Sequence, residues 1–218
     1  MIQGNTMKQL EGLFEKSVAW SRALAAGRLG EEGADMFFSD ARDVFSDLKK
    51  DIPDLKSPMN RTNFAAAPFA LSAYRAAMPR MEPDEALDFA AGLSLAAVDG
   101  FLKEEMPWIA RKVMGSRFLL LPVVSILFRV ESLWDEPEGW AYRFPRPRKN
   151  ELLSVDVARC GIQRFMEAHG APDLCRKAIC PGDDMIVAAY FPAGTRLERS
   201  KLISEGDTCC AFRFILER

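Results

Sequence analysis

The chain has 218 residues, of which 49% are hydrophobic and 28% charged, a balance typical of a globular protein with a buried core. Its 29 Lys and Arg residues stand against 31 Asp and Glu, for a formal net charge of −2. This balance argues against a protein that binds nucleic acid through a basic surface, so we expect no nucleic-acid partner.

The N-terminal sequence and the cysteines indicate where the protein works. No basic segment followed by an apolar stretch is present near residue 1, so we expect no secretory signal. The longest apolar run, FLLLPVVSILF from Phe118 to Phe128, is shorter than the roughly 20 residues that cross a bilayer. The five cysteines are then expected as free thiols in a reducing compartment. We therefore expect a cytoplasmic protein without a transmembrane segment.

The first 135 residues are predicted to be helical. Apolar side chains recur at helical spacing over residues 7–26 and again over residues 34–52. Between these segments we expect Gly27, Gly30 and Gly33 to end the first helix.

Two further helices are expected before residue 105. A loop rich in Pro and Asn occupies residues 51–63, and Thr62 or Asn63 could cap the helix that follows. Pro68 lies in the second turn of that helix and is expected to kink it or delay its start. Pro83 is typical of a first helical turn, so the next helix is expected to begin there.

The apolar run from Phe118 to Phe128 allows two interpretations. The favoured one is a buried helix or a pair of buried strands. The alternative is a patch that contacts a membrane surface or a partner, next to the basic residues Arg111, Lys112 and Arg117.

The pattern changes after residue 135, and residues 136–218 are predicted to mix strands with short helices. ELLSVDVAR (151–159) alternates apolar and polar residues, and so does CCAFRFIL (209–216). GIQRFMEAHG between them has helical spacing and ends at Gly170. We therefore expect an α+β fold, with a helical region 1–135 and an α+β region 136–218 packed as one unit around a small antiparallel sheet.

The motifs of several common sites are missing. The chain has one histidine, so a site with two histidine ligands is excluded. Neither a phosphate-binding glycine loop nor a dinucleotide-binding fingerprint occurs in the sequence. We expect no cofactor, and we expect His169, on an apolar helix face, to be a core residue rather than a catalytic one.

The segment CPGDD could carry chemistry. Asp183 follows Cys180 by three residues, so both side chains can share one face of a helical turn. The carboxyl group could then shuttle protons during attack on a carbon–nitrogen double bond. An ionised carboxylate would also raise the thiol pKa and weaken the nucleophile, so a cation such as Arg196, Arg199 or Arg213 would be needed.

The other thiols leave two readings open. Cys160, Cys180 and Cys210 could converge on a metal ion, but their spacing lacks the paired knuckles of zinc sites. Buried and unreactive thiols are the favoured interpretation, and no metal is expected.

The segment from Val155 to Phe214 resembles the L-2-amino-thiazoline-4-carboxylic acid hydrolase family. The similar pieces are VDVARC, which ends at Cys160, then FMEAHGAPDL, then CPGDD as the Cys-x-x-Asp motif of the family, and GTRLERSKLISEGDTCCAFRF as its closing segment. The helical half is similar in NRTNFAAAPFALSAYRAAMPRMEPDEA, whose residues are common in helices.

The resemblance implies roles for six residues. It implies that catalysis involves Cys180, Asp183 and Cys210, and that the substrate is bound by Arg213, Arg199 and Cys160. Asp183 would be the general acid or base, and the arginines would anchor a substrate carboxylate. Cys210 could be a nucleophile or part of the pocket wall, and we favour the wall.

The closing segment departs from the family at one position. The family has Asp after the closing Cys, where this chain has Ala211. Positions 211 and 213 point to the same side of a strand, so the candidate ion pair with Arg213 is missing. A family threonine is replaced by Ser200 or Lys201.

Three functions remain open from the sequence. The first is a hydrolase that opens a small cyclic amidine-like substrate, of the thiazoline carboxylate type, at a carbon–nitrogen bond. The second is a non-catalytic small-molecule-binding or sensor domain, which the loss of the family Asp at Ala211 favours. The third is a protein that docks a partner through Phe118 to Phe128. The expected partners are a small-molecule substrate or ligand and a second copy of the chain in a homodimer.

Overall fold

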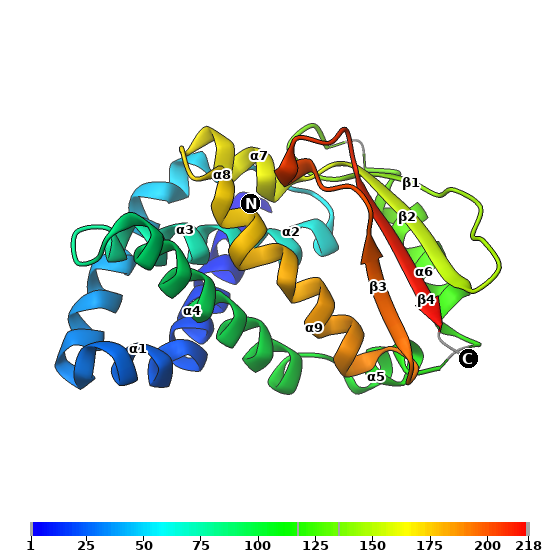
Figure 1. Ribbon diagram of the computed structural model, residues 1–218. Coiled ribbons are helices and arrows are strands. Elements are labelled where there is room, and N and C mark those ends of the chain that lie inside the picture. The colour runs from blue at the N-terminus through cyan, green and yellow to red at the C-terminus, as the bar shows by residue number, and fades with distance from the viewer. Residues whose placement is uncertain (1, 117, 135, 217–218) are drawn as a thin grey trace.

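A computed structural model describes residues 2–116, 118–134 and 136–216. Helices form one side of the molecule and a small antiparallel sheet forms the other, with α9 running between them (Figure 1). The structure thus confirms the α+β fold, with a helical N-terminal half followed by strands and short helices.

As predicted, two helices precede residue 52, and one of the three glycines separates them. Helix α1 spans Ile2–Leu48 and continues into a short 3₁₀ turn, Lys49–Asp51. Only Gly30 leaves the helical conformation, with φ 75° and ψ 167°, and the chain folds back there, so that Phe14 stacks on Phe45 with ring centroids 4.2 Å apart. Glycine adopts positive φ without the steric clash of a Cβ atom. The expectation that Gly27 and Gly33 also end the helix was wrong.

Helix α2 begins before the position predicted for its cap. The Ser57 hydroxyl oxygen accepts the backbone N–H of Asn60 at 3.1 Å, and Pro58 occupies the first turn. Ser57 therefore caps α2, whereas the helix that Thr62 or Asn63 was expected to cap, α3, follows Ala65 and has no side-chain cap. The expected start at Pro83 is confirmed for the third helix of this group. The three helices are α2 (Pro58–Phe64), α3 (Ala66–Ala77) and α4 (Pro83–Glu104).

The apolar run lies at the surface. Helix α5 spans Trp108–Met114 and α6 spans Leu120–Glu131, so the run is one helix rather than two strands. Leu120 is 1% exposed, but Phe118 is 83% and Ile126 59% exposed. The expectation of a buried run was wrong for its outward side. No described helix is long and apolar enough to cross a membrane.

The sheet has four antiparallel strands in the order β1-β2-β4-β3. Val155 lies opposite Phe212 and Val157 opposite Cys210, so apolar side chains from both central strands share one face. This confirms the alternation predicted for both strands. The strands are β1 (Ala141–Arg143), β2 (Glu151–Arg159), β3 (Thr195–Arg199) and β4 (Cys210–Leu216).

The second half also contains a continuous helical stretch with a wide turn inside it. Helix α7 spans Gly161–Ala168, and Gly170 follows it with φ 72°, as expected for a glycine stop. The stretch after it consists of α8 (Pro172–Leu174), a π-helical turn (Cys175–Ile179) and α9 (Cys180–Tyr190). A short 3₁₀ turn, Ile203–Glu205, precedes β4.

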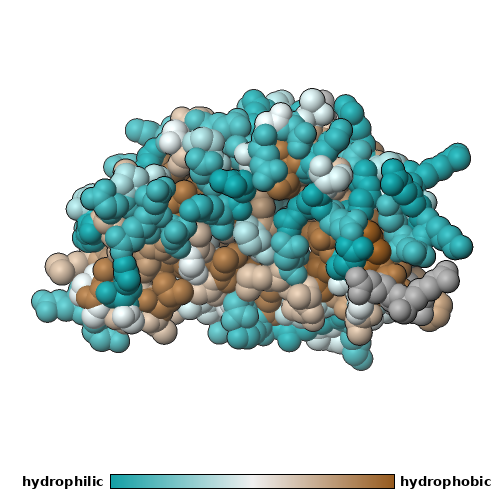
Figure 2. Space-filling model, in the orientation of Figure 1, coloured by the Kyte–Doolittle hydropathy of each residue, from teal (hydrophilic) through white to brown (hydrophobic). Residues whose placement is uncertain are grey.

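The main hydrophobic core joins the two halves of the chain. Phe37 and Phe69 from the helical half belong to the same cluster as Val157, Ile162 and Cys210 from the other half. Hydrophilic side chains cover much of the face in Figure 2, and hydrophobic ones gather toward its lower edge. Burial of such a cluster is the main favourable contribution to folding.

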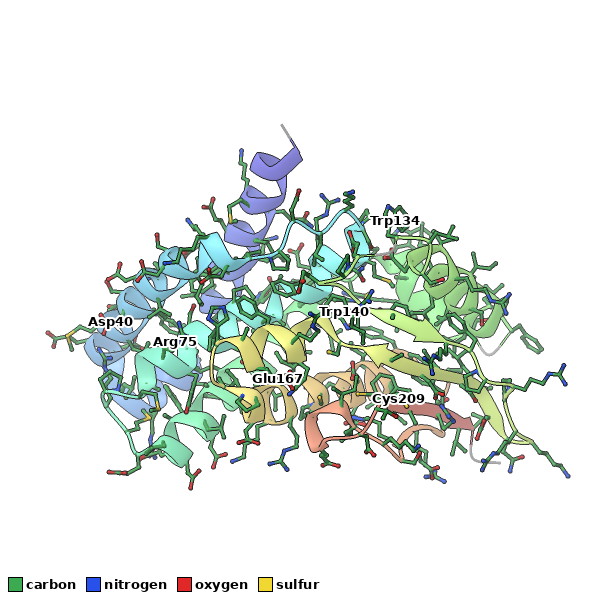
Figure 3. The ribbon with its side chains drawn as sticks, turned by 90° about the horizontal axis from the view of Figure 1, so that it is seen from above. Asp40, Arg75, Trp134, Trp140, Glu167 and Cys209 are labelled. Carbon is green, nitrogen blue, oxygen red and sulfur yellow. The ribbon has the colours of Figure 1, made fainter. Side chains whose placement is uncertain are left out.

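Two buried glutamates connect the segment after α6 to the start of α2. Glu136 accepts the backbone N–H of Ser57 at 3.0 Å and the side-chain amide of Asn60 at 2.7 Å. The Ser57 hydroxyl donates to Glu131. These bonds hold the segment that leads to Trp140, four residues after Glu136. Trp140 belongs to the main core cluster between the helices and the sheet and is labelled in Figure 3.

Candidate functional site

A cavity of about 300 Å³ lies between the helices and the apolar face of the sheet. This volume is at the lower end of the range for small-molecule pockets, about 300–1,000 Å³. Trp20 of α1, Phe69 of α3 and Phe101 of α4 line it on the helical side, while Val155 and Phe212 line it on the sheet side. The cavity therefore draws its wall from most of the length of the chain.

Three cysteines meet in the wall of the cavity. Cys160 follows β2, and Cys175 and Cys180 lie at the two ends of the π turn. Interaction with the Cys175 thiol is the main reason why the pKa values of Cys160 and Cys180 are lowered, and its single S–H can donate to one of these sulfurs at a time. The same contacts, together with burial, raise the pKa of Cys175. Cys160 and Cys180 are therefore the sulfurs most ready to ionise in this group.

The π turn explains how Cys175 and Cys180 come together. Pro181 has no N–H and its ring crowds the carbonyl four residues earlier, which disfavours an ordinary helical turn. The N–H of Cys180 bonds instead to the carbonyl of Cys175, five residues back. Sequence reasoning missed Cys175 as a site residue, although its five-residue spacing from Cys180 fits one π turn.

Asp183 lies in the first turn of α9 and lines the same cavity as Cys180. Burial raises the pKa of its carboxyl to about 6; nearby Arg199 works against this rise and Asp184 adds to it. A carboxyl group with this pKa can exchange protons near neutral pH, which suits a general acid or base.

Cys210 is also part of the cavity wall, but its pKa is shifted in the opposite direction from those of Cys160 and Cys180. Its sulfur accepts the backbone N–H of Ile203 at 3.3 Å, and burial raises its pKa to about 11. It is therefore a neutral thiol at physiological pH. Cys209, labelled in Figure 3 next to the start of β4, does not line the cavity.

Arg213 lies on the opposite face of the sheet from the cavity. Its guanidinium is 2.8 Å from the Asp156 carboxylate and donates to the Phe212 carbonyl at 2.8 Å. The carboxylate missing at Ala211 is thus supplied by the neighbouring strand β2. Arg213 does not line the cavity, where a substrate anchor would have to be.

Arg199 lies behind the cavity wall rather than in it. It forms an ion pair with Asp184 and donates to the Cys180 carbonyl at 3.1 Å. Its guanidinium also packs over the Phe212 ring, 5.7 Å from the centroid. These contacts position α9 against β3, and from behind the wall the Arg199 charge still lowers the pKa values of Asp183 and Cys180.

His169 lies at the end of α7 and does not line the cavity. Its carbonyl accepts from Arg75 at 3.2 Å, and its ring packs against Phe165 with centroids 4.4 Å apart. Burial, and then the Arg75 charge, lower its pKa. The side chain is half-buried in a structural position.

Tyr142 on β1 is a cavity residue that sequence reasoning missed. Its ring packs against Phe128 of α6 with centroids 4.8 Å apart, and both residues line the cavity. Burial raises the pKa of its phenol, so the hydroxyl stays neutral and can donate or accept a hydrogen bond. The alternation in WAYRF was the signal that could have placed it on the inner face.

The described residues contain no group of three or more His, Cys, Asp or Glu side chains arranged to hold a metal ion. The Cys160, Cys175 and Cys180 thiols affect one another's pKa values.

The family assignment follows from the sequence that builds this cavity. A model of the L-2-amino-thiazoline-4-carboxylic acid hydrolase family matches residues 61–214. The chain belongs to this family. The match takes in the helices α3 and α4 as well as the strands, so it extends well before Val155, where the specific resemblance began. No curated protein matches the chain. The name of the family indicates a hydrolase-like function for this member.

Proposed function

We propose that this family member is a hydrolase that opens a small cyclic amidine-like ring, of the thiazoline type, at a carbon–nitrogen bond. The observation that carries the proposal is Asp183, whose pKa is raised to about 6 in the wall of the cavity that Cys180 also lines. Membership of the hydrolase family supports the same reaction class.

In the proposed reaction, water adds to the carbon of the carbon–nitrogen double bond. The ionised Asp183 accepts the proton that the water loses as the carbon–oxygen bond forms. Asp183 returns that proton to the ring nitrogen. It then takes the proton of the new hydroxyl group and passes it to the same nitrogen while the ring carbon–nitrogen bond breaks, which leaves a carbonyl group and a free amine. Because one carboxyl group first takes and then gives a proton, a pKa close to the working pH suits both steps.

The thiols have separate roles in this proposal. Cys180 is the nucleophile to test, because Cys175 lowers its pKa and it shares the cavity wall with Asp183. Attack by its sulfur would replace attack by water in the first step, and water would release the product afterwards. Cys210, as a neutral thiol, serves as pocket wall.

Separate variants test these roles. Asp183→Asn should lower the turnover of 2-amino-thiazoline rings at least 100-fold, within the usual contribution of a general acid or base. Cys180→Ser should lower it similarly if sulfur attacks, and only a few-fold if water attacks. Cys209→Ser, outside the cavity, is the matched control. Unchanged turnover in a folded Asp183→Asn variant would refute the mechanism.

A non-catalytic binding domain is the second candidate, because most of the cavity wall is apolar. Such a pocket retains a ligand by burial without any bond being broken. A thermal-shift screen with small cyclic amidines and lipids, followed by product analysis on every compound that binds, separates the two functions. Binding without product for all hits would favour the binding domain.

A further inference from the structure

The charges around the cavity are unevenly distributed. Among the described residues that line it, none is Lys, Arg or His, and Asp183 is the one carboxylate. Cys160 and Cys180 add negative charge when they ionise, since their pKa values are lowered. The cavity can therefore be neutral or negative, while a positive charge would have to come from the ligand.

The two arginines that could have reversed this balance are held elsewhere. Arg213 pairs with Asp156 on the far face of the sheet. Arg199 pairs with Asp184 and donates to the Cys180 carbonyl from behind the wall. Moving either side chain into the cavity would break these contacts and leave a carboxylate without its partner.

A substrate carboxylate would meet unfavourable surroundings in this cavity. Transfer of an ionised carboxylate from water to an apolar site is costly unless it is paired and hydrogen-bonded, and a second negative charge near Asp183 adds repulsion. A cyclic amidine is a base, and its protonated form is a planar cation with N–H donors. Such a cation matches the carboxylate of Asp183 in charge and in hydrogen-bonding geometry.

We propose that this enzyme selects cyclic amidines that carry no carboxylate, with Asp183 binding the amidinium and the apolar wall accepting a hydrocarbon substituent at the ring position where the substrate named for the family has its carboxylate. The inference rests on the proposed function for the identity of the ring. The aromatic side chains of Trp20, Phe69 and Phe101 supply the apolar wall for such a substituent.

The test measures binding by calorimetry on the full chain, separately from turnover. Two carboxylate-free probes, 2-amino-2-thiazoline and its 4-phenyl derivative, are compared with 2-amino-thiazoline-4-carboxylate. We expect at least one carboxylate-free ring to bind 10-fold or more tightly than the carboxylate. Asp183→Asn should weaken its binding at least 10-fold, while Asp173→Asn, which removes an exposed carboxylate from the same helical stretch, should leave it unchanged.

Two results would overturn the inference. One is equal or tighter binding of the carboxylate compound, and the other is failure of both carboxylate-free rings to bind. Binding that depends on Asp183 but gives no product would refute the hydrolase proposal and leave the charge preference standing. Turnover of the carboxylate compound with the higher kcat/KM would refute the charge preference and leave the hydrolase proposal standing.

Discussion

Arg213 of β4 and Asp156 of β2 form a 2.8 Å ion pair on the side of the sheet that faces away from the cavity. Asp156 lies directly opposite Ala211, the position at which the family resemblance led us to expect an Asp. The carboxylate that pairs with Arg213 therefore comes from the neighbouring strand β2. The pair organises the sheet and adds nothing to the cavity wall.

This exchange predicts a specific stability pattern. Ala211→Asp would place two carboxylates opposite each other at a buried position, so we expect it to lower the free energy of unfolding by about 1–3 kcal/mol. Adding Asp156→Ala should restore most of that loss, because Asp at 211 can then pair with Arg213. Urea unfolding of both variants measures the effect. If the variant with Ala211→Asp alone were as stable as the parent, the register of β2 and β4 would be contradicted.

Asp183 predicts how stability depends on pH. Its pKa of about 6 in the folded protein lies above the ordinary value of 3.8, so the folded state binds this proton more tightly. Its contribution favours folding below pH 4 and is lost as the pH rises through about 6. Between pH 4 and 7 we expect the parent to lose roughly 2 kcal/mol relative to Asp183→Asn. Chemical denaturation at each pH measures the free energy of unfolding of both proteins. If the two free energies change with pH in parallel, the pKa of Asp183 is not raised.

The cysteines should differ in their rates of alkylation. At pH 7.5, iodoacetamide should modify Cys180 at least 10-fold faster than Cys210, because the pKa is lowered for the first and raised to about 11 for the second. Peptide mass spectrometry of the native protein measures both rates. Cys175→Ala should slow modification of Cys180, since it removes the donor that stabilises the thiolate. If Cys210 were labelled faster than Cys180, the assignment of Cys180 as the more reactive thiol would be wrong.

The two sides of α6 should respond differently to truncation. Leu120 is 1% exposed, so Leu120→Ala should lower the free energy of unfolding by about 2–4 kcal/mol. Ile126 is 59% exposed, and Ile126→Ala should change it by about 0.5 kcal/mol or less. Thermal and urea unfolding compare the matched pair. Similar losses in both variants would mean that the outward side is covered in solution.

The sequence predicted the strands well because their side chains alternate. The bounds of β2 follow the segment ELLSVDVAR, and the inward side of β4 holds Cys210, Phe212 and Phe214 as expected. The same alternation places Arg213 on the other side, since an odd spacing separates it from Cys210. A shared pocket for both residues was therefore inconsistent with the strand pattern itself.

Other features depend on tertiary structure and could not be predicted from local patterns. Three glycines in one helical segment look alike, and only packing decides that Gly30 kinks while Gly27 and Gly33 stay helical. The apolar composition of α6 indicated burial, whereas its position on the outside of the molecule leaves one side exposed. Pro181 disfavours an ordinary helical turn but does not specify a π turn, so the meeting of Cys175 with Cys160 and Cys180 could be seen only in the folded chain.

The π turn also sets the rotational phase of everything that follows it in α9. Each residue of an α-helix advances the side-chain direction by about 100°, and the widened turn inserts one extra residue before Cys180. A chain shortened by one residue here would close an ordinary helix and turn Asp183 by about that angle relative to Cys175. The number of residues between Leu174 and Pro181 therefore helps to determine the geometry of the site, whichever side chains occupy those positions.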